Sequence, residues 1–272
     1  MASNFIILNG FDRSGTSAIS KVLAYHPQIE LIMQPFNSGF VREVMNFEYK
    51  ERDISKHSFL FFDSLRNNML RNDLIKSHWY FEYSTTTVYK ENQLHLIKTT
   101  INHLFQKWMK LNFPDIEVWG IWRDPKKIVN SIFRNDFYNK WYQNAVDEIA
   151  FTVANCEILK DHFTPFINRL NSDVRKMSFL IAVRTYYFLY YLDSDKLLNY
   201  ENFVSSYNYL NKFTNAYSLT DFNFNECADI DYNIVGKSYE NKEEIEVSLE
   251  DEMFMDLIFT ELYNLKEEKF IV

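Results

Sequence analysis

The sequence predicts an α/β protein in which a parallel sheet is flanked by helices. Short apolar runs typical of buried parallel strands recur along the chain, and segments with helical spacing of their apolar residues follow them. The chain has 272 residues, of which 47% are hydrophobic and 24% charged, and this composition suits a packed domain rather than a disordered chain. We therefore expect one domain over residues 1–272.

The first strand is expected at Phe5–Leu8, an apolar run followed by Asn9-Gly10, which is a turn signal. A helix is expected over Thr16–Tyr25, where Ala18, Ile19, Val22 and Leu23 recur at helical spacing. His26-Pro27 ends this helix, because the residue before a proline is pushed out of the α region.

The second strand is expected at Leu94–Lys98, followed by the helix cap Thr99-Thr100 and a helix over 101–108 with apolar residues on one face. The third strand is Glu117–Trp122. Arg123-Asp124-Pro125 then opens a helix, since Asp is a good cap and Pro costs nothing at the first helical position.

From residue 145 onward the pattern is mainly helical. The expected elements are helices over 145–191 with breaks at 164–165 and 171–172, a strand at 196–200, a helix at 202–213, a loop at 215–248 and a closing amphipathic helix at 250–265. Ligands of such sheets bind beyond the carboxyl ends of the strands, so we look for functional residues there.

Charge and cysteine content exclude several classes of protein. With 29 basic and 37 acidic residues the net charge is −8, which argues against a general affinity for nucleic acids. Cys156 and Cys227 are too few for a disulfide framework or a thiolate metal cluster. The longest apolar stretch, 178–192, is interrupted by Arg184 and is too short to span a bilayer. With no signal peptide at the N-terminus either, we expect a cytoplasmic protein. The oligomeric state is not indicated.

The segment 10–17, Gly-Phe-Asp-Arg-Ser-Gly-Thr-Ser, lies between the first strand and its helix, where backbone N–H groups can bind an anion. It has the length of the triphosphate-binding loop G-x-x-x-x-G-K-[ST], but Thr16 occupies the lysine position. Without that lysine, hydrolysis of a magnesium-bound triphosphate lacks a main part, although Arg13 supplies charge from within the loop. The alternative is a tight turn that binds nothing.

Three motifs follow one another along the chain. Arg13-Ser14-Gly15-Thr16-Ser17 fits the pattern [RK]-[ST]-G-[ST]-[ST], and its helix ends in His26-Pro27. Arg123 at the end of a strand is followed eight residues later by Ser131, and the segment 198–203 contains Tyr200-Glu201. In these motifs and their order the chain resembles the sulfotransferases that use 3′-phosphoadenosine 5′-phosphosulfate (PAPS).

The resemblance implies the P-loop nucleotide-hydrolase-like fold of that family, PAPS as co-substrate, its product PAP, and no metal. Because PAPS has two separated anionic ends, it needs two anion sites, each best built at a helix N-terminus with an arginine nearby. The loop would hold the 5′-phosphosulfate, and Arg123 with Ser131 the 3′-phosphate. The residues implied in binding PAPS are Arg13, Ser14, Gly15, Thr16, Ser17, Arg123, Ser131 and Tyr200.

Catalytic groups are implied in the same way. Arg13 and Lys98 would stabilise the charge that develops on transfer, Lys98 because Ile97-Lys98-Thr99-Thr100 matches the family segment Ile-Lys-Thr-His apart from its last residue. The last residue of that family segment is a catalytic His, and Thr100 stands in its place here. Many members use instead a catalytic Glu shortly after His-Pro, and that position holds Gln34, which can orient a hydroxyl but cannot take its proton. The remaining candidate bases are His103, His57, His78, Glu30 and Glu82. Among them we favour His103, for which burial beneath its helix is the alternative.

The acceptor is the least determined part. Residues 36–93 are expected to form an insertion that shapes the acceptor pocket, and the loop 215–248 to lie near the nucleotide. Aromatic and polar residues in 36–93 suit a carbohydrate, an alcohol or a phenol equally well. Two alternatives stay open: a non-catalytic member that only binds PAPS or PAP, and a kinase with a degenerate loop.

Overall fold

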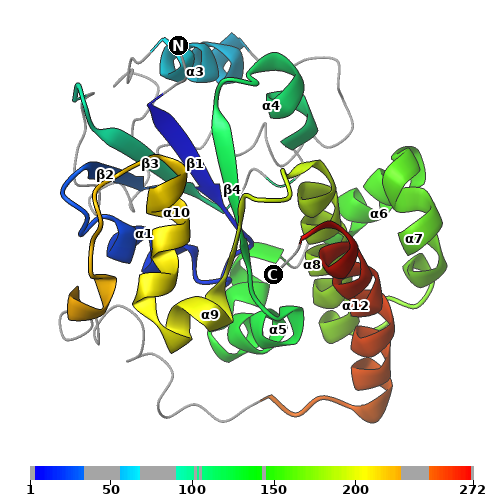
Figure 1. Cartoon of the computed structure of the whole chain (residues 1–272). Helices are drawn as coiled ribbons and strands as arrows, with labels where there is room; N and C mark the ends of the chain where they lie inside the picture. The colour runs from blue at the N-terminus through cyan, green and yellow to red at the C-terminus, as the bar shows by residue number, and fades with distance from the viewer. Residues whose placement is uncertain are drawn as a thin grey trace.

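A five-stranded parallel sheet forms the centre of the molecule (Figure 1), seen in a computed structural model that describes residues 4–33, 56–67, 90–100, 103, 106–142, 145–227 and 245–270. The strand order is β2-β3-β1-β4-β5, and each neighbouring pair is parallel. The strands are β1 (Phe5–Asn9), β2 (Ile29–Met33), β3 (Leu94–Thr99), β4 (Glu117–Trp122) and β5 (Leu197–Asn199). The predicted α/β class is confirmed.

Helices cover both faces of the sheet. On one face lie α1 (Thr16–Leu23), α9 (Tyr200–Ser205), α10 (Asn211–Ala216) and the 3₁₀ turns at Tyr207–Leu210 and Phe224–Cys227. On the other face lie α3 (Lys56–Arg66), α4 (Gln106–Asn112), α5 (Pro125–Arg134), the π-helical turn η4 (Tyr138–Tyr142), α6 (Ala145–Asn155), α7 (Glu157–Ile167), α8 (Asp173–Tyr191) and α12 (Leu249–Lys269).

The strand sequences decide which side chain meets which layer. Successive strand residues point to opposite faces, so Phe5 and Ile7 join the core beneath α8 and α5, whereas Ile6 and Leu8 pack against α1. Every residue of β1 is buried. A short strand that is apolar over residues 5–8 and buried on both sides is what a central parallel strand requires.

Most predicted elements are present, with bounds that shift by a few residues at their ends. The helix opened by Asp124 is confirmed: its carboxylate accepts a hydrogen bond from the Lys126 N–H at 2.9 Å, and Pro125 is the first helical residue. The break before α8 is also confirmed, since Ser172 caps this helix by accepting from the Arg175 N–H at 3.2 Å.

Several expectations are wrong in detail. The break at 164–165 is absent, because α7 continues through Pro165 to Ile167 and buries Leu159, Phe163 and Phe166 on one side. Packing of that apolar side outweighs the hydrogen bond that proline removes. The helix expected over 202–213 is divided into α9, a 3₁₀ turn and α10. Residues 101, 102, 104 and 105 of the helix expected over 101–108 lie outside the described part, and α4 is described from Gln106.

Strand β2 was not predicted. Its sequence, Ile-Glu-Leu-Ile-Met, begins two residues after Pro27. Glu30 interrupts the apolar run, so the segment lacks the pattern of a buried strand. The paired strand β3 defines it, with Glu30 opposite His95 and Met33 opposite Lys98. Most of the predicted insertion 36–93 lies outside the described residues, apart from α3 and the residues 90–93 that lead into β3.

The predicted loop 215–248 is described at its two ends only. Its first residues complete α10, and Thr220 accepts a hydrogen bond from His26 at 2.9 Å, beside the carboxyl end of α1. Residues 228–244 lie outside the described part. Among the helices that the structure describes, none combines the length and the apolar character needed to cross a membrane.

Candidate functional site

The loop between β1 and α1 has the backbone of an anion-binding turn. Arg13 and Gly15 both have positive φ angles, 69° and 95°, and the Ser14 N–H donates to the Phe11 carbonyl at 3.0 Å. Gly15 is the N-cap of α1, and no side chain caps this helix end. The first N–H groups of α1 are therefore left to an anion, which the helix dipole also favours.

Tyr200 lies directly against this turn. A Cβ added to Gly15 would stand 2.1 Å from Tyr200 Cδ2, so the aromatic ring occupies the space that any other residue at position 15 would need. Asn199 fixes the start of α9 by accepting a hydrogen bond from the Asn202 N–H at 3.1 Å, and Tyr200 is the first residue of that helix. The carboxyl end of β5 thus supports the loop after β1.

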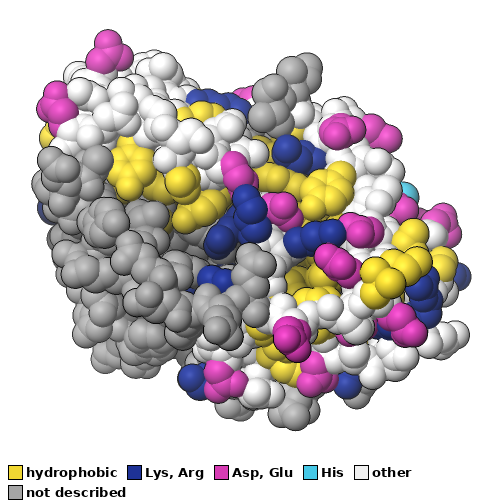
Figure 2. Space-filling model, turned by 90° about the horizontal axis from the view of Figure 1, so that it is seen from below, with side chains coloured by type: hydrophobic (Ala, Val, Ile, Leu, Met, Phe, Trp, Pro, Cys, Tyr) yellow, Lys and Arg dark blue, Asp and Glu magenta, His cyan; other side chains and the backbone are white. Residues whose placement is uncertain are grey.

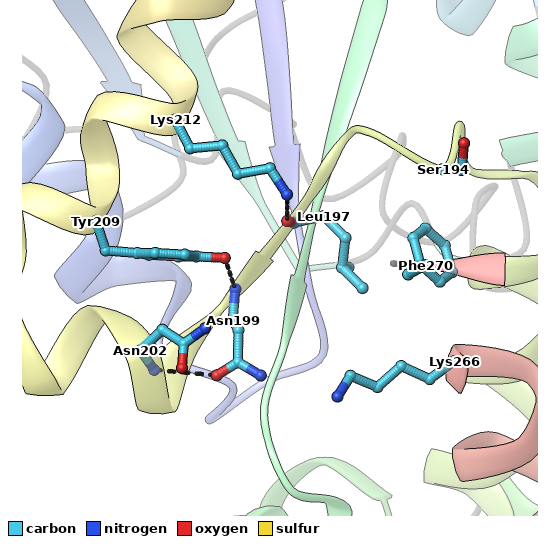
Figure 3. Close-up of a pocket in the computed structure, with 8 residues that line it drawn as sticks. All are labelled: Ser194, Leu197, Asn199, Asn202, Tyr209, Lys212, Lys266 and Phe270. Carbon is cyan, nitrogen blue, oxygen red and sulfur yellow. Dashed lines mark hydrogen bonds between the residues drawn. The ribbon is translucent and has the colours of Figure 1, made fainter. Parts of the chain in front are cut away.

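The outer edge of β5 is also held in place, as Figure 3 shows. The Tyr209 hydroxyl accepts from the Asn199 N–H at 3.0 Å, and the Lys212 ammonium donates to the Leu197 carbonyl at 3.1 Å. A small hollow of about 180 Å³ adjoins this edge. Its lining residues are Ser194, Leu197, Asn199, Asn202, Tyr209, Lys212, Lys266 and Phe270. None of these residues belongs to the loop 10–17 or to the predicted site. Their contacts therefore support the edge of the sheet.

Arg123 and Arg13 join the two anion sites that the sequence predicts. The Arg123 guanidinium lies over the Tyr200 ring at 4.8 Å and donates to the Arg13 carbonyl at 2.6 Å. The Arg13 side chain donates to the Ser131 hydroxyl of α5 at 3.0 Å and lies 5.1 Å from the Phe137 ring centre. The residues predicted for the two anion sites thus belong to one cluster, in which the loop, β4, α5 and α9 meet.

Two buried polar atoms of this cluster lack a partner among the described residues: the Ser14 hydroxyl and Arg123 Nε. A buried donor without a hydrogen bond costs about 1–3 kcal/mol, so such atoms usually mark a site that a ligand or water completes. Both are donors, and both lie beside the uncapped helix end. The residues present therefore fit a phosphate-bearing ligand.

Lys98 reaches this end of the sheet from β3, on the same face as α1, and its side chain is 3% exposed. Burial lowers the pKa of its ammonium from 10.5 to about 8, while the carboxylate of Asp12 opposes this shift and Lys21 adds to it. At neutral pH Lys98 is a buried cation near the loop, which is where the sequence predicts one.

His103 lies on the other face of the sheet, 2% exposed, between the rings of Phe11 at 5.5 Å and Phe188 at 5.4 Å. Burial, aided by the positive charge of Arg184, lowers its pKa to about 3. Neither ring nitrogen has a hydrogen-bond partner among the described residues. This imidazole is neutral and a weak proton acceptor, which does not favour it as the base.

The other predicted bases are less informative. Gln34, His78 and Glu82 lie outside the described residues, and of His57 only its place in α3 is described. Glu30 forms an ion pair with Lys90 near the amino end of β2, at the far end of the sheet from the loop. Thr100, at the family's histidine position, is buried.

Sequence reasoning missed two residues of the site. Asp12, immediately before Arg13, accepts a short hydrogen bond from the hydroxyl of Tyr142 in η4. The Tyr142 ring also stacks on Phe11, with 5.9 Å between ring centres. An acidic residue within the loop was a visible signal for Asp12, whereas nothing in the sequence connects residue 142 to residue 12.

Basic side chains lie on the face of the molecule where the carboxyl ends of the strands are found. In Figure 1 the strands run downward to α5 and α9, and Figure 2 looks onto this lower face. Lys and Arg side chains gather in its middle, with acidic ones close beside them. Among the described residues, no group of three His, Cys, Asp or Glu side chains could hold a metal ion.

Comparison with known proteins gives the following matches. A family model described as "Sulfotransferase family" matches residues 5–170. A solved sulfotransferase from Alicyclobacillus acidocaldarius is 12% identical, with 98% of this chain and 96% of that chain covered and a TM-score of 0.43. Sulfotransferase STF1 from Mycobacterium tuberculosis H37Rv is 11% identical, with 97% and 77% covered and a TM-score of 0.42. No curated protein matches.

Proposed function

The chain belongs to the sulfotransferase family, and on this premise we propose that it transfers the sulfuryl group of PAPS to a hydroxyl group of a carbohydrate, an alcohol or a phenol. The observation that carries the proposal is the cluster of Gly15, Tyr200 and Arg123 with the unpartnered Ser14 hydroxyl beside the uncapped end of α1. Such a cluster suits a nucleotide with phosphate groups rather than an uncharged ligand.

The nucleotide would be held from two directions. The N–H groups of residues 14–17 and the Ser14 hydroxyl would bind the 5′-phosphosulfate, while Arg123 and Ser131 would bind the 3′-phosphate. The Ser131 hydroxyl accepts a hydrogen bond from the Arg13 side chain. We expect the ligand to replace this contact, because a phosphate oxygen is a stronger acceptor for a guanidinium than a hydroxyl is.

Two cations would assist the transfer itself. As the acceptor oxygen bonds to sulfur, the bond from sulfur to the 5′-phosphate oxygen breaks, and negative charge grows on that phosphate. Arg13 within the loop and Lys98 at the end of β3 are placed to stabilise this charge. Lys98 is buried, and a charge in a poorly solvated site acts more strongly than one in water.

The rivals make different predictions. A kinase with a degenerate loop would need a magnesium-bound triphosphate, and Thr16 stands where such a loop has its lysine. A non-catalytic relative would bind PAP and PAPS without turnover, and Gln34 and Thr100 at the family's two base positions keep this alternative open.

Thermal unfolding with PAP and with ADP, both without magnesium, tests the proposal. PAP at 100 times its dissociation constant should stabilise the fold by about 2.7 kcal/mol, and ADP, which lacks the 3′-phosphate, by clearly less. Arg123→Ala should reduce the PAP effect far more than the ADP effect. Arg66→Ala is the matched control, since this arginine forms a surface ion pair with Asp115. Equal stabilisation by PAP and ADP would contradict the assignment of Arg123 and Ser131.

A further inference from the structure

The proposed transfer leaves one role unfilled, the acceptor of the hydroxyl proton. The two positions that supply it in related enzymes carry Gln34 and Thr100 here, and neither side chain can take a proton at neutral pH. The inference below rests on the proposed function and identifies a residue for this role.

Asp12 is a carboxylate built into the phosphate loop. It is partly exposed and directly precedes Arg13. The backbone turns at Arg13, which has a positive φ angle. Arg13 reaches Ser131 on α5, whereas the charge of Asp12 acts on Lys98 of β3. The carboxylate thus stands next to Arg13 in the chain, and its charge acts on Lys98; these are the two cations proposed to stabilise the reacting group.

Tyr142 holds this carboxylate in one orientation. Its hydroxyl donates to Oδ2 of Asp12, and its ring stacks on Phe11, the residue before Asp12. Burial and the neighbouring carboxylate raise the pKa of Tyr142 well above its usual value, so the phenol stays a donor at any pH of interest. Oδ1 of Asp12 receives no hydrogen bond from the described residues, which leaves one oxygen available to an incoming hydroxyl.

Among the described residues, the other acid–base groups that could take this role are engaged by other partners or buried. Asp124 caps α5 and accepts from the Tyr263 hydroxyl at 3.3 Å. His26 is bonded to the Thr220 carbonyl beside the far end of α1, and Glu30 is paired with Lys90. His103 is buried and neutral.

We propose that Asp12 is the general base of the reaction. As the acceptor oxygen forms its bond to sulfur, its proton passes to Oδ1 of Asp12, and the bond from sulfur to the 5′-phosphate oxygen breaks with its electron pair going to PAP. The protonated carboxyl then returns its proton to solvent. Lys98 and Arg13 offset the charge on the phosphate, and Tyr142 orients the base.

The role of Asp12 is tested by measuring the release of PAP from PAPS in the presence of a panel of phenols, alcohols and sugars. PAP is released whichever of these compounds is the acceptor. Asp12→Asn keeps the size of the side chain and its ability to accept from Tyr142. It should lower turnover about 100-fold or more, as expected for loss of a general base, while PAP still raises the melting temperature as in the wild type. Asp193→Asn, on a surface ion pair with Lys110, is the matched control and should keep wild-type turnover.

A pH profile and a double variant separate a base from a residue that acts only through Lys98. Wild-type turnover should fall on the acid side of its pH profile, and the residual turnover of Asp12→Asn should lack this acid limb. In a Lys98→Ala background, Asp12→Asn should still cause a further loss of at least about tenfold. No further loss would mean that Asp12 serves only to hold Lys98, and it would overturn the proposal.

The remaining outcomes are decisive too. Turnover of Asp12→Asn within threefold of the wild type overturns the base assignment and leaves the proposed function standing. PAP binding by the wild type with no PAP released from PAPS by any acceptor indicates a non-catalytic relative, in which Asp12 has no such role. Absence of PAP binding overturns the proposed function itself.

Discussion

Replacing Lys98 with methionine should stabilise the protein at neutral pH, because the fold buries a charge there. The pKa of Lys98 falls from 10.5 to about 8, mainly through desolvation, and its side chain is 3% exposed. A pKa difference of this size between the folded and unfolded states lowers the free energy of unfolding at neutral pH by about 3 kcal/mol. Methionine has a similar length and no charge, so Lys98→Met should recover as much as about 3 kcal/mol at pH 7, or roughly 6–9 °C in melting temperature.

The pH dependence of this effect follows from the direction of the shift. Below pH 8 the lysine is charged in both the folded and the unfolded state, and the folded state bears the full desolvation cost of the buried charge. Between pH 8 and 10.5 the unfolded chain binds a proton that the folded chain lacks, so wild-type stability rises with pH. Above that range the cost is gone. The advantage of Lys98→Met should therefore be greatest at pH 7 and disappear near pH 10.5.

Urea unfolding of the wild type and Lys98→Met at several pH values between 6.5 and 10.5 measures this difference. Lys140→Met is the control, since Lys140 is exposed, and its effect should not vary in the same way. Turnover of Lys98→Met should be reduced but still measurable, while PAP binding persists. A stability difference that does not change with pH, or destabilisation at pH 7, would refute the argument that the charge of Lys98 is poorly solvated.

Three further variants test the site and its surroundings. Gly15→Ala should destabilise the fold by about 1–3 kcal/mol and abolish the PAP-induced shift in melting temperature, because alanine at φ 95° is strained and its Cβ would meet the Tyr200 ring; Gly15→Ala with Tyr200→Ala should recover part of the loss. Burial lowers the pKa of His103 to about 3, so wild-type stability should fall as the pH drops from 6.5, because the unfolded chain gains a proton there. His103→Asn should remove this contribution from acid unfolding curves and keep turnover within a few-fold of the wild type. Lys126→Ala, which breaks a surface ion pair with Asp256, should change stability by less than about 1 kcal/mol and PAP affinity by less than threefold, measured by calorimetry.

Local features of the sequence were sufficient for most of the fold. Three features are decided by residues within a few positions of one another: the buried strand Phe5–Asn9 with its apolar run 5–8, the cap formed by Asp124 with Pro125, and Ser172 before α8. Steric preference and hydrogen bonding act over that range, so a single sequence is enough to predict them. The loop residues 10–17 belong to the same class.

Other features depend on packing with distant segments. Strand β2 is defined by pairing with β3, which lies far along the chain and sets Ile29 opposite Leu94. Pro165 remains inside α7 because the apolar side of that helix is buried against its neighbours. In both cases tertiary contacts override the local pattern.

By itself, the sequence determined that this protein has a parallel α/β fold with the loop 10–17 after its first strand, and it predicted the arginines and the lysine of the candidate site. Only the tertiary structure decided how they are combined. It joins Arg13 to Ser131, places Tyr200 on Gly15, and brings Tyr142 to Asp12 across 130 positions of the chain. It also buries His103, which removes the advantage of the base that the sequence favoured. The reason is that hydrogen bonds and burial depend on distance in space, whereas a motif records only distance along the chain.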